Sequence, residues 1–505
     1  MKSINHVYAL SGLAAIILSG SVKAQQKNIL FIAVDDLKPC VGAYGDHHAK
    51  TPGIDRLARE GIVFRNTYCQ QAVSGPTRAS LLTGMHPDKT RVWDLVTDLR
   101  QVNPNVVTLP QYFKSMGYIT AGMGKIYHLE SAGPGHDAPS WSIRYRDAKR
   151  IHYALPYAPT ARGYGKAVEC ADVPDNTYHD GSMTEMAIGL LDSLSRNEKP
   201  FFLAVGYMKP HLPFASPKKY WDLYDRNKFE IASFQKKALN SPDVAYHASE
   251  GLKKYSDIPQ FDSYTEDEMD HLPVEKQKEL IHGYYAATSY VDAQILKLLD
   301  ELDRLGIRNN TIIVLWGDHG WHLGDHGLCT KMTNFEEATH VLLMMSIPDQ
   351  KAGIRIQSIV EFTDIFPTLC DLVNIPKPKY LDGISLVPII NNPKSEIREY
   401  ALSQYPRDSD KMGYSIRTKR FRYTVWFSKN FRTNMQYDEN SAIARELYDY
   451  KKDPLETENI INKLKYQKEK RRMEKLFNEC MAREFSTCAS YSKIADYQPP
   501  KNTRK

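Results

Sequence analysis

The stretch Asn28-Ile-Leu-Phe-Ile-Ala-Val-Asp-Asp36 decides the fold of this chain. Its apolar run, from Asn28 to Val34, has the length of a strand and predicts one that is buried. Three similar runs lie at 118–121, 200–207 and 311–316, and each is followed by a polar turn and then by a helical pattern. This alternation predicts an α/β fold with a large, mostly parallel sheet flanked by helices.

The length and texture of the chain predict two domains. Its 505 residues exceed the usual size of a single domain. After about residue 393 the pattern changes to short β-like runs, GYSIRT, FRYTVW and ELYDY, and then to an amphipathic helical stretch from Ile461 to Phe485. We therefore predict a large domain over residues 25–393 and a smaller α+β domain over residues 394–505, with an antiparallel sheet and a terminal helix.

The first 24 residues have the layout of a secretory signal. Lys2 precedes a short apolar run from Ala9 to Leu18, and small residues follow up to Ala24. The apolar run is too short to span a bilayer, which takes about 20 residues, and the sequence has no other candidate span. We expect a soluble mature protein that begins near Gln25 and resides in a bacterial periplasm, with secretion as the alternative.

The chain is mildly basic, with a net charge of +6 at pH 7. This excess favours an anionic small substrate but is far below that of a nucleic-acid binder, so we expect no nucleic-acid partner. The basic run from Lys463 to Arg472 fits a solvated helix face. Seven cysteines leave at least one free thiol. Cys480 and Cys488 are candidates for a disulfide, which the sequence does not settle.

Polar side chains follow the strand-length runs directly. They are Asp35, Asp36, Lys125, His128, His211, Asp318 and His319. Ligands of open α/β sheets collect at the carboxyl ends of the strands. We therefore expect these side chains to meet at one edge of the sheet.

A second feature is Ser74-Gly75-Pro76-Thr77-Arg78, which leads into a helical pattern that stops at Gly84. Proline suits the start of a helix, so Ser74 should lie at a helix N-terminus. Free backbone N–H groups and the helix dipole favour an anion there, and Arg78 adds a full positive charge. The alternative is a serine N-cap on an ordinary surface helix.

Taken in order, these elements resemble the sulfatase family, from about Asn28 to ELYDYKKDPLETEN. The likeness is greatest to the iduronate-2-sulfatase branch. It rests on these stretches, in chain order: VDDLKP, YGD, QQAVSGPTRASLLTG, PDKTRVWD, GKIYH, KPHLPF, DHGWHLGDHG, KMTNFEEATH, SQYPR, MGYSIRT and RYTVW. The resemblance implies the alkaline-phosphatase-like sulfatase fold and hydrolysis of a sulfate ester.

The resemblance also implies an unusual nucleophile at Ser74. In this family the first residue of the Cys/Ser-x-Pro-x-Arg element is oxidised to formylglycine (3-oxoalanine), and the hydrated aldehyde attacks sulfur. A serine in this place implies a sulfatase-maturating enzyme of the anaerobic type, while Thr77 departs from the more usual serine. An unmodified serine needs a base, and none is adjacent in sequence. In a geminal diol on a divalent metal, one hydroxyl is acidified for attack and the other later expels sulfate.

The metal ligands implied by the resemblance are Asp35, Asp36, Asp318, His319 and an oxygen of residue 74. Carboxylates concentrated at two strand ends are costly unless a cation neutralises them. Oxygen ligands suit Ca²⁺ or Mg²⁺, and the resemblance favours Ca²⁺. Many sulfatases have asparagine in place of His319, whereas the iduronate branch has histidine.

The remaining catalytic residues follow from the same motifs. Lys125 and Lys331 would hold the non-bridging sulfate oxygens, and Arg78 would steady the hydrated aldehyde. His211 is the candidate acid that protonates the departing sugar oxygen, because imidazole titrates near neutral pH. His128 would bind sulfate or act as the base in the elimination step.

The predicted substrate is a 2-O-sulfated uronate in a heparin-, heparan- or dermatan-type fragment. Arg91, Trp93, Asp94 and Arg407 are candidates to line its pocket, with an arginine pairing the carboxylate. The histidines of GWHLGDHG, His322 and His326, have the spacing of a metal pair but no counterpart as ligands in the family, so we interpret them as loop residues.

Two other functions remain open from sequence. Another enzyme of the superfamily, such as a choline sulfatase or a phosphonate or phosphodiester hydrolase, would share the metal and the nucleophile and differ only in the pocket. An inactive glycan-binding protein of the same fold would result if Ser74 were never oxidised.

Overall fold

The computed structural model describes residues 26–133, 136–428, 431–432 and 438–491, without the side chains of 130 and 487–491. The predicted signal at residues 1–24 lies outside this part of the chain. Within it, no helix combines the length and the apolar character needed to cross a membrane.

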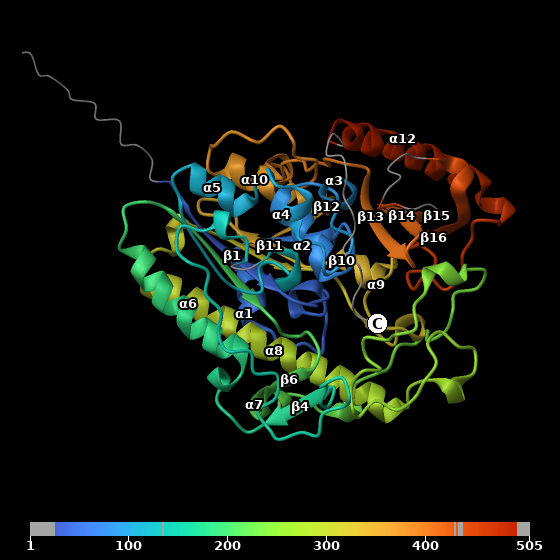
Figure 1. Ribbon diagram of the computed structural model, residues 1–505, viewed down its shortest axis with the longest axis horizontal. Helices are drawn as coiled ribbons and strands as arrows, with labels where there is room; N and C mark the ends of the chain where they lie inside the picture. Colours follow the sequence, from blue (N-terminus) through green and yellow to red (C-terminus); the bar gives the residue numbers. More distant parts are fainter. Residues whose placement is uncertain (1–25, 134–135, 429–430, 433–437, 492–505) are drawn as a thin grey trace, which may run out of the picture.

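An eight-stranded sheet forms the centre of the molecule (Figure 1). Its order is β10 (His340–Val341), β2 (Ile62–Tyr68), β11 (Leu343–Ser346), β7 (Thr311–Gly317), β1 (Asn28–Val34), β5 (Phe201–Tyr207) and β3 (Ile119–Gly124), and β12 (Ile354–Glu361) also pairs with β2. Strands β3, β5, β1 and β7 are parallel to one another. Strand β11 pairs antiparallel with both β7 and β2, and β10 pairs antiparallel with β2. The predicted large, mostly parallel sheet is confirmed.

Strand β1 is buried on both faces, and its side chains alternate between two cores. Ile29, Phe31 and Ala33 pack with the apolar residues of one helical layer, and Leu30 and Val34 with those of the other. The first layer contains α2 (Ser74–Thr83), α5 (Leu109–Ser115), α10 (Ile365–Leu372) and α11 (Val387–Asn391). The second contains α1 (Pro52–Glu60), α6 (His179–Ser195) and α8 (Val274–Arg304).

A second, antiparallel sheet lies at the C-terminal end of the chain (Figure 1). It consists of β13 (Tyr400–Arg407), β14 (Lys411–Thr418), β15 (Phe421–Ser428) and β16 (Ala442–Asp449), and its apolar face packs against α12 (Gln467–Tyr491). Sequence patterning predicted three of these strands and the helix but missed β13, because Pro406 interrupts its run. The domain boundary at 393 stays a prediction.

Short elements complete the fold. They are α3 (Pro87–Thr90), α4 (Leu99–Val102), α7 (Lys218–Trp221), α9 (Glu336–Thr339), the parallel pair β4 (Val168–Ala171) and β6 (Phe214–Pro217), and the hairpin β8 (His322–Leu323) and β9 (Cys329–Thr330). Cys480 and Cys488 both lie on α12, where eight residues at about 1.5 Å each separate them by about 12 Å, beyond disulfide reach. The side chain of Cys488 is not described.

Helix α1 begins at Pro52, a residue that suits the first position of a helix, but its N-terminus is held from another helix. Thr51 makes no side-chain cap. Instead, the buried carboxylate of Asp292, on α8, accepts hydrogen bonds from Gly53 N (3.0 Å) and Ile54 N (2.6 Å). Asp292 therefore joins two helices of the same layer through N–H groups that lack a partner within their own helix.

Asp292→Ala is expected to lower the free energy of unfolding by about 1–3 kcal/mol, because it leaves two buried N–H groups without an acceptor. Urea unfolding followed by fluorescence measures this change. Asp300→Ala, in the same helix, removes an exposed carboxylate that pairs with Arg56, and should cost less than about 1 kcal/mol. Equal losses in the two variants would contradict the capping role.

Candidate active site

The order of the sheet brings three loops together at its carboxyl edge. Strand β1 lies between β5 and β7, and Val34 stands opposite both Tyr207 and Gly317. Asp35 and Asp318 therefore follow adjacent strand ends. This is the edge at which open α/β sheets bind ligands.

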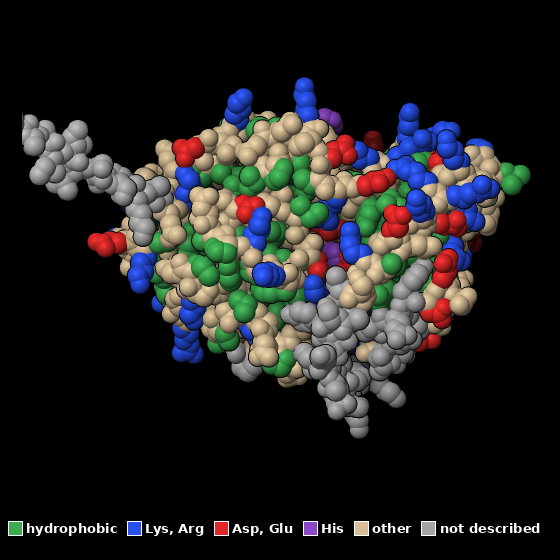
Figure 2. Space-filling model, turned by 90° about the horizontal axis from the view of Figure 1, so that it is seen from above, with side chains coloured by type: hydrophobic (Ala, Val, Ile, Leu, Met, Phe, Trp, Pro, Cys, Tyr) green, Lys and Arg blue, Asp and Glu red, His purple; other side chains and the backbone are tan. Residues whose placement is uncertain are grey.

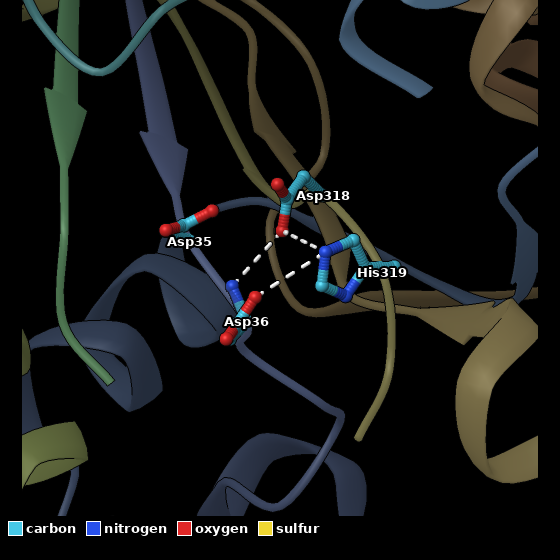
Figure 3. A group of neighbouring side chains, drawn as sticks. All are labelled: Asp35, Asp36, Asp318 and His319. Atoms are coloured by element: carbon cyan, nitrogen blue, oxygen red, sulfur yellow. Dashed lines mark hydrogen bonds and ion pairs between the residues drawn. The ribbon is translucent and has the colours of Figure 1, made fainter. Parts of the chain in front are cut away.

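Asp35, Asp36, Asp318 and His319 form a buried acidic group (Figure 3). Each offers one ligand atom, and these atoms lie within 4.8 Å of one another. Asp36 has a φ of 59°, which is uncommon for a residue with a side chain and marks a sharp turn directly after Asp35. Tyr284, on α8, donates from its hydroxyl to the Asp36 carbonyl at 2.5 Å and so fixes this turn.

The hydrogen bonds of this group leave some of its potential ligand atoms available to a cation. Oδ2 of Asp36 is buried and has no hydrogen-bond partner among the described residues, and burial raises the pKa of this carboxyl group. His319 Nδ1 donates to the Gly320 carbonyl (3.0 Å), and burial lowers the pKa of the imidazole. In the neutral ring, Nε2 therefore turns its lone pair toward Oδ1 of Asp36 (3.3 Å) and of Asp318 (3.5 Å). Facing lone pairs favour a metal ion between them.

Ser74 is the first residue of α2 and lies against the acidic group. Its Oγ is 3.0 Å from Asp35 Oδ1 and 3.2 Å from His319 Nε2. The N-cap of α2 is Val73, and no side chain caps this helix. The alternative of a serine N-cap on a surface helix is therefore wrong, because the hydroxyl points to the strand ends and every residue of α2 is buried.

Three cations surround the carboxylates. The fully buried Arg78 donates from Nε to Asp318 (2.9 Å) and from Nη2 to Asp35 (3.2 Å). Lys125 donates to Asp35, and Lys331 to Asp36. The Lys331 ammonium also lies 5.0 Å from the Trp321 ring centroid. Although burial opposes it, the charge of Lys125, with His211 and Arg78, holds the pKa of Asp35 well below its usual value.

The two predicted histidines lie at the rim of the site. His211 Nε2 is 3.9 Å from Asp36 Oδ2, and its side chain is 36% exposed, whereas Asp36 is fully buried. Nδ1 of His211 donates to the Leu212 carbonyl at 2.6 Å, so Nε2 faces the site and carries a proton only in the imidazolium form. Burial lowers the pKa of this ring to about 3. Burial and the charge of Lys125 lower the pKa of His128, whose buried Nδ1 has no hydrogen-bond partner in the part of the chain that the structure describes. The structure thus brings all of the predicted catalytic and metal residues together.

The predicted pocket residues are engaged elsewhere. Asp94 accepts from the backbone of Val96 and Thr97 and pairs with Arg432 at 2.7 Å, and these bonds lower its pKa against the effect of burial. Its carbonyl lies beside Gly75, where a Cβ atom would come within 2.6 Å of it. The segment around Asp94 therefore packs directly on the start of α2.

Arg407 also has a packing role. It donates to the carbonyls of Ala245 (3.0 Å), Tyr246 (3.0 Å) and Pro406 (3.1 Å), and stacks on Tyr405. Arg91 is half-buried and has a φ of 58° at the end of α3. The charged groups of Asp94 and Arg407 thus already have partners within the protein.

Sequence reasoning missed the residue that joins the two branch-specific stretches. Asp88 is 5% exposed and accepts hydrogen bonds from Trp93 Nε1 (2.8 Å), Gln404 Nε2 (2.8 Å) and the Tyr414 hydroxyl (2.6 Å). PDKTRVWD and SQYPR thus contact each other. The available signal was the occurrence of Asp88 and Trp93 in one short motif. The other two partners of Asp88, Gln404 and Tyr414, are 316 and 326 positions away in sequence.

His322 and His326 lie apart from the acidic group. His322, in β8, shares a hydrogen bond with Thr333 (2.9 Å), and His326 stacks on Phe335 and faces the Glu456 carbonyl (3.2 Å). His326 lies in the short turn after β8, whereas His322 lies in the strand itself, so the interpretation as loop histidines is wrong for His322. The ring centroids are 6.3 Å apart, and the expectation that the two bind no metal stays a prediction.

Comparisons with known proteins agree with this fold and site. The family model described as Sulfatase matches residues 27–375, and the model described as N-sulphoglucosamine sulphohydrolase, C-terminal, matches residues 324–483. A relative from Mus musculus, Iduronate 2-sulfatase, is 34% identical over 88% of this chain and 92% of its own length. The Homo sapiens protein of the same name is also 34% identical, over 86% and 91%.

Solved structures show the same architecture. That of BT1596, a 2-O GAG sulfatase, has a TM-score of 0.66 and 25% identity and covers 92% of this chain and 94% of its own. A phosphonate monoester hydrolase of Agrobacterium radiobacter has a TM-score of 0.73 at 21% identity over 91% and 96%, which shows the fold alone. Fold and site thus define a hydrolase of the alkaline-phosphatase-like class. The chain belongs to the sulfatase family and is a sulfuric ester hydrolase.

Asp36→Ala should weaken binding of Ca²⁺ or Mg²⁺ by at least about 10–100-fold. Removing a group that only hydrogen-bonds to a metal ligand already costs about this much, and Asp36 is a proposed ligand itself. Calorimetric titration of chelator-treated protein measures the affinity without any need for turnover. Asp94→Asn, which alters a carboxylate outside the acidic group, serves as the control. An unchanged affinity in Asp36→Ala would show that the ion binds elsewhere.

Proposed function

We propose that this chain removes the 2-O-sulfate of a uronic acid residue at the non-reducing end of a heparin-, heparan- or dermatan-type fragment. The nucleophile comes from oxidation of Ser74 to formylglycine. The observation that carries the proposal is the position of Ser74, whose Oγ lies 3.0 Å from Asp35 and 3.2 Å from His319. Support for the sugar comes from the names of the relatives, Iduronate 2-sulfatase and a 2-O GAG sulfatase.

We infer that Asp35, Asp36, Asp318 and His319 hold a divalent cation, Ca²⁺ or Mg²⁺, together with an oxygen of residue 74. The unpartnered Oδ2 of Asp36 and the lone pair of His319 Nε2 fit such an ion. When bound, the cation supplies the positive charge that acidifies a hydroxyl group at residue 74.

The cations of the site suit a sulfate group. Lys125 and Lys331 border the acidic group from two separate segments, so their ammonium groups can hold non-bridging oxygens on which negative charge develops. Arg78 is buried behind them and holds Asp35 and Asp318 in place, which steadies the modified residue 74. All three side chains form ion pairs with the buried carboxylates, and these pairs stabilise their positive charges.

The proton that the departing sugar oxygen needs comes from the imidazolium form of His211, which the negative charge of a bound sulfate group favours. Its Nε2 faces the site from a partly exposed side chain, as a group that meets substrate must. His128, on the Lys125 side, binds sulfate or acts as the base when sulfate is expelled. The uronate carboxylate would be recognised at Arg91 or Arg407, and Asp94 would line the same pocket. Arg407 could take part besides its packing role, because its bonds to the three carbonyls need only three of its five N–H donors.

The proposal includes export to the periplasm after cleavage near Ala24, and modification of Ser74 by an anaerobic-type maturating enzyme. Residues 25–393 carry the catalytic domain and 394–505 the smaller one. A specificity for glucosamine sulfates is the second candidate. It is favoured by N-acetylglucosamine-6-O-sulfatase of Bacteroides thetaiotaomicron, which is 28% identical over 95% of this chain and 91% of its own length.

Ser74 should be converted to formylglycine when the chain is produced together with an anaerobic-type maturase, and remain serine without one. Peptide mass spectrometry detects the change as a loss of two hydrogens at residue 74. Sulfatase activity should rise in proportion to the modified fraction. A fully active enzyme with an unmodified Ser74 would refute the nucleophile.

The mature enzyme should prefer a 2-O-sulfated uronate disaccharide over 6-O- and N-sulfated glucosamine, as measured by kcat/KM. Arg91→Gln should lose about 1.5–3 kcal/mol on the uronate, a factor of roughly ten to more than a hundred, if it pairs the carboxylate. An aryl sulfate, which has no carboxylate, is the control substrate and should be spared. A preference for either glucosamine would overturn the assignment while leaving sulfatase chemistry intact.

A further inference from the structure

The loop that carries His211 is fastened by a buried lysine. Lys209 is 4% exposed and lies two residues before His211, just after β5. Its Nζ donates to the His211 carbonyl at 3.0 Å and to the Pro213 carbonyl at 2.5 Å. One ammonium group thus bridges the backbone of the short segment from His211 to Pro213.

Lys209 is itself anchored from α6. The Asp180 carboxylate accepts from the backbone N–H groups of Met208 (2.9 Å) and Lys209 (2.8 Å) and contacts His179 Nδ1 at 2.9 Å. Within the described part of the chain, Lys209 forms no ion pair within 4.0 Å, and burial lowers its pKa to about 8. A buried ammonium without a carboxylate partner costs stability. The hydrogen bonds of Lys209 go instead to two backbone carbonyl groups.

The backbone that Lys209 holds sets the direction of the His211 ring. Nδ1 of His211 donates to the carbonyl of Leu212, which lies between the two carbonyls bound by Lys209. That hydrogen bond fixes the ring so that Nε2 faces Asp36 at 3.9 Å. A shift of this segment by a fraction of an ångström would move the proton donor away from the substrate oxygen.

We propose that Lys209 is a positioning residue that holds His211 for proton transfer to the leaving sugar. The inference rests on the proposed function of His211. In the step concerned, an oxygen of modified residue 74 bonds to sulfur, the bond between sulfur and the sugar oxygen breaks, and its electron pair stays on the sugar oxygen. That oxygen takes the Nε2 proton of an imidazolium His211, which leaves the neutral ring with its remaining proton on Nδ1. Among the described residues, the bonds of the Lys209 ammonium go to backbone carbonyls and not to the proposed metal ligands, so its effect on the proton would pass through the backbone.

Leaving-group dependence separates this role from a general effect on folding. A sugar alkoxide needs a proton as it departs, whereas a nitrophenolate leaves without one. In matured enzyme, Lys209→Met should lower kcat/KM about 10–100-fold on the sugar sulfate that the enzyme hydrolyses best, and less than about 3-fold on 4-nitrophenyl sulfate. The ratio of the two values does not depend on the fraction of active enzyme.

His211→Ala and Lys199→Met complete the experiment. His211→Ala should show the same selective loss, about 10²–10⁴-fold on the sugar ester, the range for removal of a general acid. Lys199, exposed before the other end of β5, is the matched control and should change neither substrate.

The outcomes that overturn the proposal are distinct. Equal losses on both substrates in Lys209→Met, or no loss on either, would overturn it. So would a failure of both Lys209→Met and Lys209→Gln to fold where His211→Ala folds, since Lys209 would then serve stability. A His211→Ala variant without selective loss would refute the acid itself and hence the proposed mechanism.

Discussion

The concentration of negative charge at the end of β1 and β7 is the constraint on which the rest of the structure depends. Asp35, Asp36 and Asp318 are fully buried, and carboxylates so close together cannot all remain ionised unless positive charge surrounds them. Arg78 supplies it from α2, and Lys125 and Lys331 supply it from two loops. The same constraint explains why the ends of β1, β3 and β7 and the start of α2 must converge, since each brings a charge that the others need.

The two-faced burial of β1 makes this convergence possible. Because its residues alternate between two helical layers, the strand cannot slip by one position without exchanging the cores. Its parallel pairing with β5 and β7 then fixes where Asp35 leaves the sheet relative to Lys209 and Asp318. The rigidity needed for a buried charged site thus comes from the apolar sheet, and the reactive groups sit on turns that the sheet holds.

The stretches PDKTRVWD and SQYPR, on which the likeness to the iduronate branch partly rests, have a packing role that the sequence did not reveal. PDKTRVWD packs its backbone against Gly75, and Asp88 ties it to Gln404 in the C-terminal sheet. These contacts place the smaller sheet beside the start of α2. A substitution in these stretches would therefore also change how the two sheets pack, and Arg407 has such a packing role through its bonds to backbone carbonyls.

The sequence by itself determined the parallel strands β1, β3, β5 and β7, the edge at which polar residues gather and the position of Ser74 at a helix start. Those features follow from local periodicity and short motifs, which depend on neighbouring residues in the chain. Only the tertiary structure decided the other strands of the main sheet, β2, β10, β11 and β12, together with β13, the helix cap by Asp292, the contacts of Asp94 and the bridge made by Lys209. The physical reason is that each of these features depends on a partner that folding brings in from a distant segment of the chain. The bond between Gln404 and Asp88 joins residues 316 positions apart, and no local pattern encodes such a partner.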